Sequence, residues 1–113
     1  MGLIYHIASA TDWDQARSVG EYTTSTKGVT LAQQGYLHAS TADQVAGVAE
    51  FYRGDTGLVL LAIDEDAVIP EIRYEPVPDR DRPFPHIYGP LNVDAVVAVY
   101  PFDPADPDRF RDR

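Results

Sequence analysis

The hydrophobic positions of the chain fall into short runs that are typical of β-strands. These runs are rich in β-branched and aromatic residues and are bounded by Gly, Pro, Asp or Ser. Residues 57–64 form the most hydrophobic run and are predicted to be a central buried strand. Residues 94–102 are predicted to be a second central strand, stopped by Pro101. The remaining predicted strands are residues 3–8, 36–39 and 72–75.

A first helix is predicted directly after the first strand. Thr11 and Asp14 have the spacing of a capping pair, which places the start of the helix at Thr11. Trp13 and Ala16 recur at helical spacing, which indicates the face that packs on the core. Gly20 is a natural stop, because glycine readily adopts the left-handed conformation that ends many helices.

A second helix is predicted after the strand at residues 36–39. Either Ser40 or Thr41 serves as its N-cap, since each has a polar partner three residues later. Gly54 ends the pattern. A clear amphipathic stripe at positions i, i+3, i+4 and i+7 should pack on the sheet; it consists of Val45, Val48, Ala49 and Tyr52.

The segments between these elements are less regular. Residues 22–26 are β-prone, and residues 29–34 could form a turn of helix. Residues 76–85 contain four prolines and are predicted to be a loop. The tail from residue 103 is rich in Pro and Asp and is expected to be frayed beyond a core at about residues 3–102. The pattern predicts one α+β domain over residues 1–113, with small mixed or antiparallel sheets and two or three helices.

Composition and charge exclude several classes of protein. The chain of 113 residues has no cysteine, which rules out disulfides and thiolate metal sites, and a formal net charge of −9. This charge makes nucleic-acid binding a poor expectation, and Lys27 is the only lysine that could support it. No apolar run approaches the length of a membrane span, so we expect a cytoplasmic protein without a membrane partner. The histidines lack the close spacing of metal ligands, and no metal is expected.

Two of the three histidines share one sequence context. His6 and His38 each lie near the end of a predicted strand, are followed by Ala-Ser or Ile-Ala-Ser, and precede a capped helix. Helix N-termini carry free N–H groups and partial positive charge, which suits phosphate. We therefore expect His6 and His38 to share a cleft for a small nucleotide-like molecule. The alternative is that both are hydrogen-bonded, half-buried structural residues. Nearby candidates for ligand binding are Ser9, Ser40 and Thr41.

The third histidine lies in a segment that prolines make rigid. Phe84, His86 and Tyr88 precede Gly89 and Pro90, and together they could form a ligand-binding wall. The alternative is a structural turn with an aromatic plug. Glu75 is a candidate general base, although a single glutamate at a strand end is more often exposed or paired with a cation.

Several motifs, in order, resemble one known family. I-Y-H-I-A, G-Y-L-H-A-S-T, L-V-L-L-A-I-D, R-Y-E and F-P-H-I-Y-G-P-L are similar to the domain-of-unknown-function 952 family over about residues 3–102. The resemblance implies an ADP-ribosyltransferase-like fold, in the branch that contains the RNA 2′-phosphotransferases. It also implies NAD as cofactor, with His6 matching an H-G-T-type motif and His38 a V-H-L-S-type motif. Ile7 replaces the glycine of H-G-T, and Glu75 is the sole candidate for a catalytic glutamate.

These observations leave two classes of function open. The first is an NAD- or nucleotide-binding, transferase-like enzyme with a cleft lined by His6, His38 and His86, where the proposed catalytic residues are His6, His38 and Glu75. The reaction would be attack at the nicotinamide ribose C1′ with loss of nicotinamide. The second is a non-catalytic domain that binds a small ligand or another protein. RNA 2′-phosphate removal is not expected, because the arginines that hold the phosphate have no counterparts that can be placed.

Overall fold

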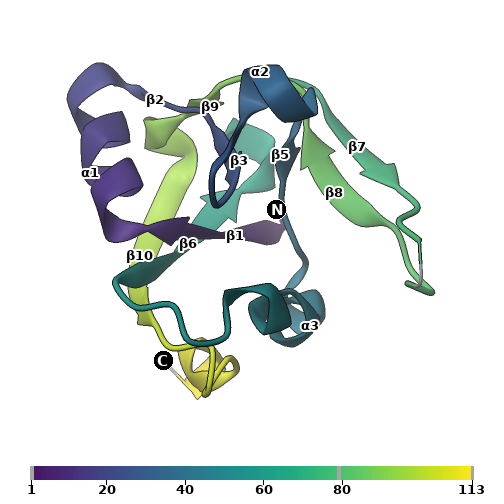
Figure 1. The fold of residues 1–113 in the computed structure, drawn as a ribbon. Coiled ribbons are helices and arrows are strands. Elements are labelled where there is room, and N and C mark those ends of the chain that lie inside the picture. Colours follow the sequence, from purple (N-terminus) through teal and green to yellow (C-terminus); the bar gives the residue numbers. More distant parts are fainter. Residues whose placement is uncertain (1, 79, 113) are drawn as a thin grey trace.

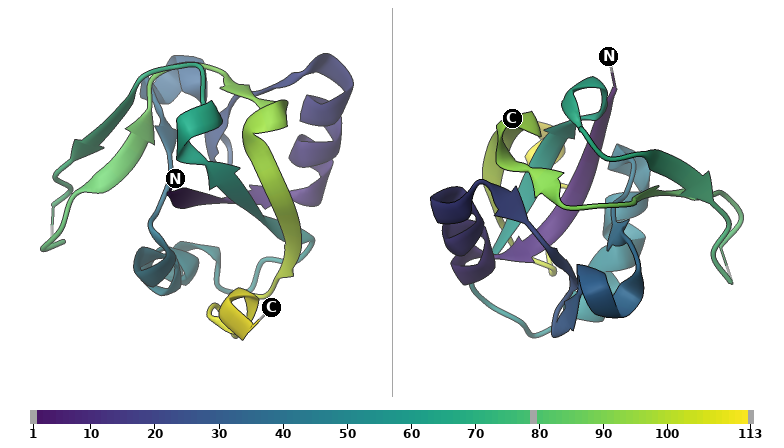
Figure 2. Two further views of the ribbon diagram at one scale, coloured as in Figure 1. Left: turned by 180° about the vertical axis from the view of Figure 1, so that it is seen from behind. Right: turned by 90° about the horizontal axis from the view of Figure 1, so that it is seen from above.

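The protein is an α+β fold built from small antiparallel sheets. The structure, a computed structural model, describes residues 2–78 and 80–112. In this part of the chain, the main sheet has the strand order β1-β6-β10, and a second three-stranded sheet has the order β5-β8-β7. Two strand pairs, β2-β9 and β3-β4, complete the sheets. Figure 1 shows β7 and β8 projecting from the body that contains the main sheet, and the view from above in Figure 2 shows the same arm.

The elements follow one another closely along the chain. The strands are β1 (Leu3–Ser9), β2 (Glu21–Tyr22), β3 (Thr24–Thr26), β4 (Val29–Thr30), β5 (Leu37–His38), β6 (Leu58–Asp64), β7 (Ile72–Glu75), β8 (Phe84–Ile87), β9 (Leu91–Asn92) and β10 (Val96–Phe102). The α-helices are α1 (Ala10–Val19), α2 (Leu31–Gln34) and α3 (Val45–Ala49). Short 3₁₀ helices cover Ala42–Gln44, Glu50–Tyr52, Glu65–Ala67, Val93–Ala95 and Arg109–Asp112.

The main sheet is buried on both faces, and β6 is its central strand, as predicted. Alternate residues of β6 enter different clusters, with Leu61 on one face and Leu60 on the other, and neither side chain is exposed. The prediction that the last strand is also central is wrong, because β10 lies at the edge of the sheet. An edge position also explains why Pro101 lies inside this strand instead of ending it.

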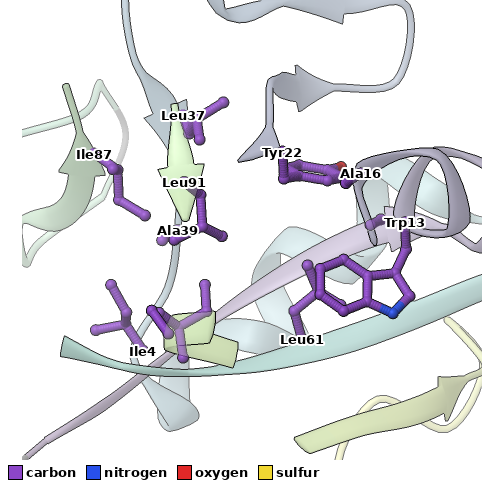
Figure 3. Close-up of a cluster of buried hydrophobic side chains, with 12 residues drawn as sticks. Ile4, Trp13, Ala16, Tyr22, Leu37, Ala39, Leu61, Ile87 and Leu91 are labelled. Atoms are coloured by element: carbon purple, nitrogen blue, oxygen red, sulfur yellow. The ribbon is translucent and has the colours of Figure 1, made fainter. Parts of the chain in front are cut away.

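The first hydrophobic cluster lies between the main sheet, α1 and the second sheet. Figure 3 shows Trp13 of α1 beside Leu61 of β6, with Leu37 and Ile87 approaching from the second sheet. Trp13 and Ala16 are both buried, which confirms the predicted core-facing side of α1. This cluster therefore holds the two sheets and the first helix together.

Helix α1 begins earlier than predicted. Ser9, and not Thr11, is the N-cap, and its Oγ accepts a hydrogen bond from the Asp12 N–H at 3.0 Å. Strand β1 runs directly into the helix, which leaves no room for the two-residue linker that a cap at Thr11 requires. Gly20 ends α1 with φ of 93°, as predicted.

The predicted second helix is shorter and less regular than its pattern indicates. Thr41 caps the 3₁₀ helix Ala42–Gln44, which continues into α3 and then into the 3₁₀ helix Glu50–Tyr52. The predicted apolar stripe is nevertheless confirmed, because all four side chains are buried in the second hydrophobic cluster: Val45, Val48, Ala49 and Tyr52.

The segment predicted to be a rigid loop around His86 is a strand. Residues 84–87 form β8, the middle strand of the second sheet, so the proline-rich loop ends at Pro83. The carbonyl of Pro85 accepts a hydrogen bond from the Ala39 N–H, so this residue turns its backbone polar groups toward the end of β5. The Pro85 nitrogen points to that same side, beyond the last paired residue of β5, so no ladder hydrogen bond to β7 is lost.

The tail after Phe102 differs from the expectation of a frayed end. Phe110 is buried, with its ring 5.0 Å from that of Tyr5 and 6.4 Å from that of Tyr100. Figure 1 shows this segment below the end of β10. The core therefore extends past residue 102, because an aromatic side chain within the polar tail covers one end of the main sheet.

Candidate functional site

One face of the second sheet carries most of the candidate residues. Side chains alternate between the two faces of a strand, so Phe84, His86 and Tyr88 share one face, and Ile87 belongs to the other. His38 of β5 is paired directly with His86. This surface is called the histidine face below; Ile87 and Leu37, on the opposite face, enter the first hydrophobic cluster.

A cavity of about 430 Å³ lies against the histidine face. His38 and His86 contribute to its wall from the sheet, together with Tyr36 just before β5. The wall also includes Tyr52, which follows α3, and Lys27, from the turn between β3 and β4. The wall is thus rich in aromatic rings, and its described residues include two imidazoles, two phenols and one ammonium group as titratable groups.

His86 is held in place by the carboxylate of Glu75. The Nδ1 atom of His86 lies 2.8 Å from Glu75 Oε1, and the hydroxyl of Tyr88 donates to the same oxygen. The ring of Tyr36 stacks on His86 with a centroid separation of 4.0 Å. The other ring nitrogen, Nε2, is buried and has no hydrogen-bond partner in the described part of the chain.

Glu75 lies beside His86 on the same face of the sheet and is not part of the cavity wall. The hydrogen bond from Tyr88 and then that from His86 lower the pKa of the Glu75 carboxyl group. The guanidinium of Arg73 lies over the ring of Tyr88 at 4.6 Å and also favours the ionised form of Glu75. The carboxylate therefore acts on His86, and it does not reach the cavity as an independent base.

His38 is half-buried in the cavity wall and stacks on Phe84 with a centroid separation of 5.2 Å. Within residues 2–78 and 80–112, no group forms a hydrogen bond with either of its ring nitrogens. Burial lowers its pKa to about 4, and the nearby rings of His6 and His86 act in the same direction. At neutral pH the ring is therefore uncharged, with one donor and one acceptor nitrogen.

His6 is near His38 but lies outside the cavity wall. Its side chain points into the first hydrophobic cluster, where Nδ1 lies 2.5 Å from the His38 carbonyl oxygen and Nε2 lies 3.1 Å from the Tyr22 hydroxyl. Burial lowers the pKa of His6. Both nitrogens are thus satisfied by a neutral ring that donates through Nδ1 and accepts from Tyr22. In this structure His6 supports the backbone that carries His38.

The other residues predicted for the site lie around the cavity and not in its wall. Ser9 caps α1, and Thr41 caps the 3₁₀ helix Ala42–Gln44. Ser40 is buried and exchanges two backbone hydrogen bonds with Tyr5, which joins β1 to the chain after β5. Phe84 stacks on His38, and Tyr88 donates to the same oxygen of Glu75 that His86 contacts.

Sequence reasoning assigned only His38 and His86 of the cavity wall to the site, and the residues that it missed include Lys27, Tyr36 and Tyr52. Tyr36 could have been found, because it lies two residues before His38 and so shares its face of the strand. Lys27, the only lysine of the chain, forms an ion pair with Asp55 at 2.6 Å and lies 5.5 Å from the centre of the Tyr52 ring. No local signal relates Lys27 to the histidines, since the β3-β4 turn reaches them only through the tertiary fold.

Two features, a metal-binding cluster of side chains and a membrane-spanning helix, are absent from residues 2–78 and 80–112. Nowhere in this part of the chain do three or more histidine, aspartate or glutamate side chains gather in a way that could hold a metal ion. Among the helices of residues 2–78 and 80–112, none has both the length and the apolar character required to cross a membrane.

Comparisons with known proteins place the chain in a family. It is similar to CC0527 from Caulobacter crescentus, whose crystal structure has a TM-score of 0.78 at 31% identity and covers 89% of this chain and 86% of that chain. The solution NMR structure of CC0527 has a TM-score of 0.73 at 33% identity, over 91% of this chain and 86% of that chain. No curated protein matches. Residues 7–99 match the family described as "Protein of unknown function (DUF952)". The chain therefore belongs to the DUF952 family.

Proposed function

We propose that the cavity on the histidine face binds an NAD-like or other nucleotide-type ligand, with the flat heteroaromatic ring of the ligand inside the cavity. The observation that carries this proposal is the combination of a cavity of about 430 Å³ with the two histidines in its wall, His38 and His86, whose ring nitrogens include three without a protein partner among the described residues. One of the three, His86 Nε2, is buried, and buried polar atoms are normally paired, so this atom supports a ligand that supplies the missing partner.

The size and chemistry of the cavity suit one ring system with a polar substituent. Its volume lies within the range of about 300–1,000 Å³ that is typical of small-molecule sites. The rings of Tyr36 and Tyr52 offer faces for stacking. A neutral His38 supplies one donor and one acceptor, which match the two functions of a carboxamide or of a nucleobase edge.

Lys27 is the group that could receive a phosphate of such a ligand. Among the described residues of the cavity wall it is the only cation, and the lysine side of its ion pair with Asp55 is more than half exposed. An exposed ion pair contributes little to stability, so an incoming phosphate can replace Asp55 at small cost. The net charge of −9 opposes an anion at Lys27 only weakly where the acidic groups are distant, because physiological salt screens charges that are more than about 8 Å apart.

The ADP-ribosyltransferase-like fold and the likeness to RNA 2′-phosphotransferases belong to this proposal. They support it because the resemblance of the motifs around His6 and His38 implies a dinucleotide in the cleft next to these strands. One feature favours binding without group transfer. Glu75, the single candidate for a catalytic glutamate, is engaged by His86 and Tyr88 outside the cavity wall. The second form of the proposal is therefore a protein that binds the nucleotide-type ligand without catalysing group transfer.

Calorimetric titration with NAD, ADP-ribose and nicotinamide tests the proposal. We expect binding by the wild-type protein and about tenfold weaker binding by the variants His38→Ala and Tyr36→Leu, the loss expected from one hydrogen bond or one stacked ring. Tyr74→Leu is the matched control, since Tyr74 is a partly exposed tyrosine outside the cavity.

The absence of heat with all three ligands would contradict the proposal, as would equal binding by the wild-type protein and both cavity variants. A separate assay for nicotinamide release from NAD distinguishes the two forms of the proposal. Release that depends on His38 indicates an enzyme, whereas binding without release indicates a ligand-binding protein.

A further inference from the structure

The pair formed by Glu75 and His86 determines which nitrogen of His86 carries a proton. An ionised carboxylate can only accept hydrogen bonds. Because Glu75 Oε1 lies 2.8 Å from His86 Nδ1, the proton of a neutral His86 ring must be on Nδ1. The Tyr88 hydroxyl donates to the same oxygen and lowers the pKa of Glu75, which keeps the carboxylate in its accepting form.

The opposite nitrogen of His86 then carries a lone pair and no proton. This atom, Nε2, is buried and unpartnered in the described part of the chain, although the His86 ring forms part of the cavity wall. A buried acceptor without a donor is unfavourable, because it has lost water and gained no replacement. A ligand that brings a donor to this atom recovers that loss, and a ligand that brings a second acceptor does not.

We propose that His86 Nε2 is an obligatory hydrogen-bond acceptor that makes the cavity select a ring bearing an N–H donor, such as a carboxamide, over its carboxylate counterpart. This inference rests on the proposed function of the same cavity. A carboxylate would place an anionic acceptor against the Nε2 lone pair, beside the neutral imidazole of His38. Glu75 is the positioning residue, since it acts on the ligand only through His86.

Access to Nε2 requires a small adjustment of the cavity wall. The atom is covered in the ligand-free fold, and His86 is only 3% exposed. Tyr36 stacks on the His86 ring and is half-buried at the cavity surface, so rotation of this side chain opens the wall around His86. Side-chain rotations of this kind are common when a ligand binds.

Nitrogen-15 NMR of the histidine rings tests the tautomer without any ligand. In the neutral ring of His86 we expect the Nε2 resonance in the region of unprotonated nitrogen and the Nδ1 resonance in that of protonated nitrogen. Glu75→Ala removes the acceptor and should shift the proton to Nε2 in part of the population. Glu71→Ala is the control, because Glu71 is an exposed carboxylate that pairs with Arg73 and does not contact His86. A protonated Nε2 in the wild-type protein would overturn the inference.

Calorimetry with nicotinamide and nicotinate tests the selectivity, because nicotinamide carries a carboxamide where nicotinate carries a carboxylate. We expect wild-type protein to bind nicotinamide at least tenfold more tightly, and the Glu75→Ala variant to show a smaller ratio. Equal or tighter binding of nicotinate would overturn this inference and leave the proposed ligand site in place. If neither compound binds and NAD and ADP-ribose also give no heat, both the selectivity and the proposed function are wrong.

Discussion

The free energy of unfolding should fall steeply when the pH decreases from about 6.5 to 4.5. His38 has a folded-state pKa of about 4, compared with 6.5 for an unperturbed histidine, and burial also lowers the pKa of His6. The unfolded chain therefore binds protons in this range that the folded protein does not, and stability is lost as the pH falls. For His38 alone the full loss is about 3 kcal/mol by pH 4, at about 1.4 kcal/mol for each pH unit.

Urea unfolding at several pH values measures this effect. The variant His38→Gln keeps a polar side chain without a titrating ring, and it should show a clearly smaller slope between pH 6.5 and 4.5, with His6 responsible for the remainder. Glu75, Glu71 and Asp43 have lowered pKa values, so their contributions are lost only at lower pH. An identical slope in the wild-type protein and the variant would contradict the assigned environment of His38.

Replacement of Phe110 by alanine should destabilise the protein by about 3 kcal/mol, at the lower end of the range for buried phenylalanines. Phe110 is only 8% exposed and packs against Tyr5 and Tyr100, so its removal leaves a cavity at the end of the main sheet. Phe51→Ala is the matched control, because Phe51 is 74% exposed and should change the free energy of unfolding by no more than about 0.5 kcal/mol.

Denaturant midpoints of the two variants and of the wild-type protein provide the comparison. If Phe110→Ala were as stable as Phe51→Ala, the segment after Phe102 would not be part of the core.

The elements with a strong and local pattern could be predicted from the sequence. The apolar run of β6 and the stripe from Val45 to Tyr52 owe their burial to side chains that are apolar in any context. The position of β10 at the edge could not be predicted, because strand order depends on long-range pairing. The apolar pattern of residues 94–102 is also typical of a buried strand. The burial of Phe110 was missed for a similar reason, since an isolated aromatic residue in a polar tail has no periodicity.

The candidate site was predictable only in part. The three histidines were singled out because their sequence contexts are distinctive, yet two of them line the cavity and His6 lies behind it. The difference arises from the direction of each side chain, which a strand-end position does not specify. The role of the segment around His86 was obscured by its prolines, which favour a loop. Once residues 84–87 are recognised as a strand, alternation places His86 beside His38.

The most direct test of the histidine-lined cavity is an NMR titration that follows the imidazole signals of the three histidines. With NAD or nicotinamide as ligand, we expect the signals of His38 and His86 to shift together and to saturate with one dissociation constant. The signals of His6 should change much less, because both of its ring nitrogens are bonded within the protein. Saturable shifts confined to His38 and His86 are the predicted result. Binding that leaves both of these signals unchanged, or no binding at millimolar ligand, would contradict the account.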